Sequence, residues 1–172
     1  SLIYSSDGGA LPVVMDTSPC SYTLKHYDEI LEGELLERWK QVTIHDVIEY
    51  LLETVLPKLK LRKVEGTAIC HPTCNTVKTE EAEMFRKIAS RCATNAVTPI
   101  HHGCCGFAGD RGLFYPELTE SATAREAAEL TSLDNIIGYF STSRTCEVAM
   151  SDATNQSWQS IVHLVDKASR NT

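Results

Sequence analysis

The segment 101–112, HHGCCGFAGDRG, constrains this chain more than any other feature, because it joins two adjacent cysteines to two histidines and four glycines. Neighbouring side chains cannot both enter one face of a core, so packing alone does not explain the pair Cys104 and Cys105. Two thiolates on a bendable backbone can point at one metal ion or cluster, and glycine allows that bend because it tolerates positive φ. The segment therefore predicts a metal or redox site, with a purely structural turn as the alternative.

The surroundings of this segment predict a loop between a strand and a helix. The run 96–101 begins with apolar residues typical of a short buried strand, and Pro116 suits the first turn of a helix that continues to about residue 130. Open α/β sheets bind their ligands beyond the carboxyl ends of the strands. We therefore expect the two cysteines to lie at that edge of a sheet.

The rest of the chain alternates between strand and helix patterns. Three more apolar runs predict strands, at 11–15, 66–70 and 135–140. Apolar residues at helical spacing predict helices at 43–56, 79–92, 116–130, 146–154 and 158–169. Thr43 is the expected N-cap of the first of these, with Asp46 three residues later as in a variant capping box. Strands separated by helices predict an α/β, Rossmann-like fold: one mainly parallel sheet with helices on both faces.

Bulk properties limit the class of protein. A chain of 172 residues is large enough for one core, so we expect a single domain. The net charge of −7 argues against a nucleic-acid partner, which requires clustered Lys and Arg. Seven cysteines, clustered and without an export signal, favour cytosolic metal or redox chemistry over a secreted disulfide framework. We expect a cytoplasmic protein, either free or at the cytoplasmic face of the membrane.

Two parts of the chain echo each other. The stretch 15–20, MDTSPC, resembles 140–146, FSTSRTC: each has an apolar strand end, a Ser/Thr turn and a cysteine. The helical pattern at 43–56 parallels the one at 161–165. These echoes predict two copies of one unit, the first of which lacks the Cys-Cys loop. Chance similarity between short α/β segments is the alternative.

The order of the cysteines, Cys-x(n)-Cys-Cys-Gly-x(n)-Cys, resembles the cysteine-rich CCG domain. This domain is known from the glycolate oxidase iron–sulfur subunit, anaerobic glycerol-3-phosphate dehydrogenase and the heterodisulfide reductase B subunit. The strings 103–112 (GCCGFAGDRG), 116–118 (PEL) and 141–147 (STSRTCE) are most similar to the version in single-chain FAD and iron–sulfur proteins of the D-lactate dehydrogenase type. The resemblance implies a complete CCG unit at 66–170, a degenerate half-unit at 11–62, and a fragment of a longer protein.

Carried over residue by residue, the resemblance implies a set of thiolate ligands. These are Cys74 (with Cys70 as the alternative), Cys104, Cys105 and Cys146, together with Cys20 as the counterpart of Cys146 in the first copy. The family often ends in Cys-x-x-Cys, whereas Ala149 stands at the second position here. Contacts from the loop to the cofactor are expected from Gly103, Gly106, Gly109 and Arg111. Cys92, among apolar neighbours in a predicted helix, is expected in the core.

The implied function is electron transfer. The resemblance implies a 4Fe-4S type cluster in this chain, FAD in an upstream domain, and a parent oxidoreductase acting on a small 2-hydroxy acid, D-lactate or glycolate. The implied partners are upstream flavin and ferredoxin-like domains and an electron acceptor, which could be a quinone, a cytochrome or a flavoprotein. The same cysteines leave three alternatives: a structural zinc site, a dithiol relay through Cys104 and Cys105, and a metal-free interaction domain.

Overall fold

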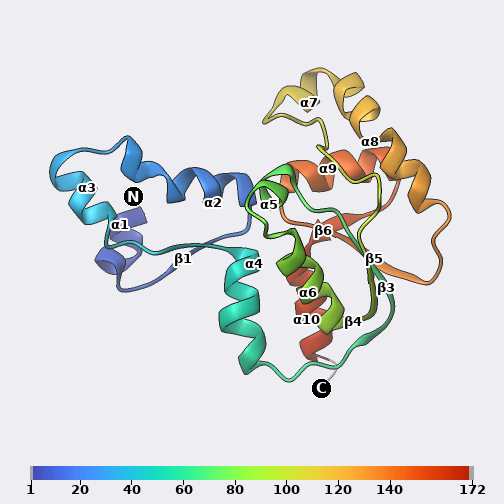
Figure 1. Ribbon diagram of the computed structural model, residues 1–172, viewed down its shortest axis with the longest axis horizontal. Coiled ribbons are helices and arrows are strands. Elements are labelled where there is room, and N and C mark those ends of the chain that lie inside the picture. Colours follow the sequence, from blue (N-terminus) through green and yellow to red (C-terminus); the bar gives the residue numbers. More distant parts are fainter. Residues whose placement is uncertain (1, 171–172) are drawn as a thin grey trace.

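Two parallel sheets organise the chain in the computed structural model, which describes residues 2–170 (Figure 1). The smaller sheet pairs β1 (Val13–Met15) with β2 (Ile44–Asp46). The larger sheet has the strand order β4-β3-β5-β6. Its strands are β3 (Val64–Cys70), β4 (Ala93–Val97), β5 (Ile136–Ser141) and β6 (Trp158–Ser160). The predicted α/β class with parallel strands is confirmed.

Helices connect these strands. The α-helices are α1 (Leu2–Ser5), α2 (Ser18–Lys25), α3 (Gly33–Trp39), α4 (Val47–Tyr50), α5 (Cys74–Lys78), α6 (Ala82–Cys92), α7 (Arg111–Phe114), α8 (Pro116–Leu130), α9 (Arg144–Thr154) and α10 (Ile161–Arg170). Short turns of other helix types occupy Asp7–Gly9, Tyr27–Glu29, Leu51–Val55 and Leu56–Lys58. No helix within residues 2–170 is long and apolar enough to cross a membrane.

Strand β3 divides the main core into two faces, because successive side chains of a strand point in opposite directions. Ala68 and Cys70 belong to the larger apolar cluster, which includes side chains of α4, α6 and α10. Ile69 belongs to a second cluster with Leu130 of α8 and Met150 of α9. The predicted helices on both faces of the sheet are therefore confirmed, and the two faces receive alternate residues of one strand.

The expectation of one continuous sheet is wrong. The strand predicted at 11–15 pairs with residues 44–46, which we predicted as the first turn of a helix. That helix begins at Val47, and its N-cap is Asp46, whose Oδ1 accepts a hydrogen bond from the Ile48 N–H at 2.9 Å. Thr43 is therefore not the cap. The β-branched Ile44 can extend as a strand because β1 offers it a partner, and this tertiary pairing is invisible to helical periodicity.

Three other boundaries differ from those predicted. The strand expected at 96–101 is β4 at 93–97, so the loop that carries the adjacent cysteines is longer. The helix expected at 79–92 begins at Ala82. The helix expected at 158–169 is preceded by β6, because Trp158–Ser160 pairs with the end of β5. The two strand corrections concern β4 and β6, the edge strands of the larger sheet, each of which pairs with one neighbouring strand.

Candidate metal centre

Three strands of the larger sheet end at one edge, and the segment after each carries a cysteine. Cys74 follows β3 and is the first residue of α5. Cys104 and Cys105 lie on the loop between β4 and α7. Cys146 follows β5 and lies in the first turn of α9. Because the strands are parallel, these segments meet at the carboxyl edge of the sheet, as predicted for the loop (Figure 1).

Cys105 and Cys146 form the closest thiol pair. Their Sγ atoms are 2.9 Å apart, and both residues are 5 % exposed, in a small cluster with Phe107 and Ala149. The hydrogen bond from Cys146 lowers the pKa of Cys105 to about 6, against the opposing effect of burial. The same hydrogen bond raises the pKa of Cys146. The short contact between the two sulfur atoms therefore favours a pair that holds one shared proton.

Cys74 and Cys104 are exposed and lie near this pair. The pKa of Cys74 is raised, first by partial burial and then by the negative charges of Cys104 and Cys105. Such mutual repulsion between thiolates is what a bound cation or iron–sulfur cluster relieves. The four thiols are thus close enough to influence one another electrostatically, and two of them are exposed.

The glycines of the loop differ in backbone conformation and in their contacts. Gly106 has a φ of +73°, and its N–H donates a hydrogen bond to the Cys104 Sγ at 3.4 Å. Gly109 also has a positive φ, of +78°, whereas Gly103 does not, and neither has a neighbour within 4 Å of an added Cβ atom. Arg111 is the exposed first residue of α7. Gly106 is therefore the glycine of this set whose N–H reaches a sulfur.

The other candidate ligands lie differently. Cys70 points into the larger apolar cluster, on the face opposite Ile69, and burial raises the pKa of its thiol to about 12. The structure does not bring Cys70 to the thiols of the loop, because the alternation along β3 turns it away. Cys92 lies in the same cluster, in agreement with the core position expected for it.

Cys20 is exposed on α2, whose start docks on the carboxyl edge of the sheet. The Ser18 N–H donates to the Thr142 carbonyl oxygen at 3.0 Å, and the Asn75 side chain donates to the Ser18 carbonyl oxygen at 3.5 Å. These contacts join α2 to the segments that carry Cys146 and Cys74. Cys20 is thus near the edge that bears the other four thiols, on its outer side.

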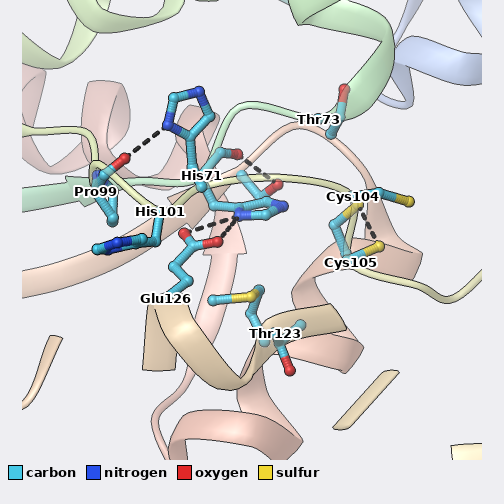
Figure 2. A network of polar contacts seen from close by, with 12 residues as sticks. His71, Thr73, Pro99, His101, Cys104, Cys105, Thr123 and Glu126 are labelled. Carbon is cyan, nitrogen blue, oxygen red and sulfur yellow. Dashed lines mark hydrogen bonds and ion pairs between the residues drawn. The ribbon is translucent and has the colours of Figure 1, made fainter. Parts of the chain in front are cut away.

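Sequence reasoning missed one group at this edge, a buried ion pair. The His71 Nδ1 lies 2.9 Å from both carboxylate oxygens of Glu126, and the two side chains are 1 % and 2 % exposed (Figure 2). The histidine follows β3 directly, and the glutamate comes from α8. A glutamate in an Ala- and Glu-rich helix resembles a solvated residue, so the sequence carried no signal for its burial.

The donor set suits a thiophilic cofactor, although no three His, Cys, Asp or Glu side chains within residues 2–170 already stand at metal-binding positions. Thiolates are the ligands that iron–sulfur clusters and zinc share. Two of the four thiols are in contact, and the other two are exposed on a loop and a helix start. Their chemistry therefore fits an iron–sulfur cluster or a metal ion, which these four thiols would hold.

Comparison with known proteins points in the same direction. The chain is 28 % identical over 117 residues to the glycolate oxidase iron-sulfur subunit of Escherichia coli, a match that covers 65 % of this chain and 29 % of that protein. The chain thus spans less than a third of the curated relative that it matches. No family model matches the chain, so the CCG assignment rests on the cysteine pattern alone. The supported conclusion is a distant relationship to an iron–sulfur subunit of an oxidoreductase.

Proposed function

We propose that this chain is an electron-transfer domain that holds an iron–sulfur cluster of the 4Fe-4S type through Cys74, Cys104, Cys105 and Cys146. The observation that carries the proposal is the position of these four residues after three parallel strands, with the Cys105 and Cys146 sulfur atoms 2.9 Å apart. The distant similarity to an iron–sulfur subunit supports the choice of a cluster over the same thiols holding zinc.

When bound, the cluster would supply one-electron transfer. The chain supplies the site around it. The contact with Cys146 lowers the pKa of Cys105, which favours the thiolate form that a cluster binds. Gly106 directs its N–H at the Cys104 sulfur, and such hydrogen bonds stabilise added negative charge on sulfur. Phe107 and Ala149 pack beside the buried pair and limit the access of water to it.

The second part of the proposal concerns the activity and the partners of the parent protein. We propose a flavin-linked oxidoreductase that oxidises a small 2-hydroxy acid, glycolate or D-lactate. Electrons would pass from flavin and ferredoxin-like partners through this domain to a quinone, a cytochrome or another flavoprotein. The similarity to a subunit whose name includes glycolate oxidase supports this assignment. Arg111 and the loop glycines Gly103 and Gly109 are proposed contacts on the cofactor side, and Cys20 a proposed outer ligand.

Anaerobic reconstitution tests the proposal. The reduced chain is incubated with ferrous iron and sulfide under argon, and iron, sulfide, visible absorption and the electron paramagnetic resonance of the reduced form are measured. We expect a brown protein whose signal is lost in Cys105→Ser and Cys146→Ser. The matched control is Cys92→Ser, which changes a core cysteine and should keep the signal. Stoichiometric, tight zinc binding without any iron–sulfur chromophore would instead support the structural-zinc alternative.

A further inference from the structure

The ion pair beneath the cysteine loop has a rigid imidazole. The His71 N–H donates to the Phe140 carbonyl oxygen at 2.9 Å, and the Ser141 hydroxyl donates to the His71 carbonyl oxygen at 3.0 Å. The ring stands edge-on to Trp158, with the ring centres 6.0 Å apart. Backbone and ring are thus both held, and Glu126 fixes the rotation of the ring through Nδ1.

The second ring nitrogen has no partner. Within residues 2–170, the Nε2 of His71 is buried and makes no hydrogen bond. A buried polar atom left unpaired costs about 1–3 kcal/mol, so such an atom in a well-packed site calls for a partner from outside the chain. Figure 2 shows the ring between the Glu126 carboxylate and the part of the loop that carries Cys104 and Cys105. His71 also lies close enough to Cys105 to favour its thiolate.

The surroundings of the two ring nitrogens decide which role is open to Nε2. Among the described residues, His71 is the hydrogen-bond partner of the buried Glu126 carboxylate, and both oxygens face Nδ1. Nδ1 is therefore the ring nitrogen engaged by the carboxylate, and Nε2 is the one turned away from it. Sulfur atoms of thiolates and of iron–sulfur clusters accept hydrogen bonds, so the role open to Nε2 beside them is that of a donor.

We propose that His71, held by Glu126, donates a hydrogen bond from Nε2 to a sulfur atom of the cluster that the neighbouring thiols bind. This inference rests on the proposed function and adds a positioning pair to it. A hydrogen bond to cluster sulfur stabilises the reduced form, which carries more negative charge, and therefore raises the reduction potential. His71 and Glu126 would thus set the potential of a site to which neither contributes a ligand.

Two measurements test the proposal. The first is made on the reduced, metal-free chain labelled with 15N in histidine, in which we expect the proposed donor, the Nε2 of His71, to carry a proton. The second compares the midpoint potential of the reconstituted wild type with that of His71→Leu/Glu126→Met. This double variant replaces both partners by apolar groups, because removing one alone would leave a buried charge unpaired and could prevent folding.

An exposed pair, between His101 of the cysteine loop and Glu129 of α8, gives the matched control. His101 Nδ1 lies 3.0 Å from Glu129 Oε2, with the histidine side chain 52 % exposed, so His101→Gln removes a similar pair away from the buried site. We expect a downward shift of potential in the double variant and none in the control. Two results would overturn the role of His71 but leave the proposed function standing. One is an Nε2 without a proton, and the other is a double variant that binds its cluster with the potential of the wild type. A wild type that forms no cluster overturns the proposed function as well.

Discussion

Gly106 lies so close to Leu118 that a Cβ atom on Gly106 would stand 2.6 Å from the Leu118 carbonyl oxygen. Its φ of +73° adds backbone strain for any other residue. We therefore expect Gly106→Ala to lose about 2–4 kcal/mol of unfolding free energy, from strain and overpacking together. Chemical denaturation of the metal-free chain measures the loss.

Gly109→Ala is the control for that experiment. Gly109 has a similar φ of +78° but open space around its Cβ direction. The strain alone should cost about 1–2 kcal/mol. Equal losses of unfolding free energy in the two variants would show that the close approach of Gly106 to α8 adds nothing to the cost of the substitution.

The shared proton of Cys105 and Cys146 predicts a bell-shaped pH dependence of stability in the metal-free chain. Between about pH 6, the pKa of Cys105, and pH 9, the ordinary pKa of a thiol, the folded pair holds one proton and the unfolded pair two. Stability should therefore rise with pH in this window, by at most about 1.4 kcal/mol per pH unit. Above the ordinary pKa the unfolded pair holds none, and stability should fall.

Denaturation curves measured across this range in wild type and in Cys146→Ser isolate the contribution of the pair. The variant lacks the second thiol and with it the shared proton, so its curve should be flatter on both sides. A wild type and variant with parallel pH profiles would contradict the shared-proton assignment.

Mild oxidation should join the same two cysteines. Their Sγ atoms are 2.9 Å apart, so a small disulfide oxidant such as diamide can take two electrons and two protons from the pair with little movement. We expect the metal-free chain to lose two mass units and peptide mapping to join residues 105 and 146. Cys92, whose thiol is buried with a pKa raised to about 11, should stay reduced. A disulfide between Cys104 and Cys105 would favour the dithiol relay instead.

Asp46 should contribute to stability through two contacts. Its carboxylate caps α4 through the Ile48 N–H and accepts a short hydrogen bond from the Ser21 hydroxyl of α2 at 2.5 Å. Asp46→Ala should cost roughly 2–3 kcal/mol, the sum of a cap and a buried charged hydrogen bond. Ser21→Ala keeps the cap and removes the second contact together with the hydrogen bond from the Ser21 hydroxyl to the Ser18 carbonyl oxygen, so its loss, measured by denaturation, should be smaller. Equal losses would mean that the cap contributes nothing.

The sequence was sufficient for the parts of the fold that local pattern determines. Apolar runs at 66–70 and 135–140 are β3 and β5, and Pro116 opens α8 as expected. The strands β2 and β6 were missed because each has three residues and forms only against a partner strand distant in the chain. Short segments of this kind carry no periodicity of their own.

The positions of four cysteines after strand ends were predictable for a similar reason. Glycines around Cys104 and Cys105 mark a loop locally, and the parallel-sheet rule then brings Cys74 and Cys146 to it. The burial of Cys70 depends on which face of β3 each residue takes, and the ion pair between His71 and Glu126 depends on the packing of α8. The division into a half-unit at 11–62 and a complete unit at 66–170 stays a prediction.

Because the thiols are distributed over three strand ends, they emerge at different times during synthesis. During synthesis, Cys74 leaves the ribosome 72 residues before Cys146, and the loop with Cys105 precedes the latter by 41. A nascent chain that stops before α9 has no partner for Cys105 and cannot close the site. Under the proposed function, cofactor insertion would therefore follow the synthesis of α9, so that a loaded site would report that β3, β4 and β5 have all taken their places.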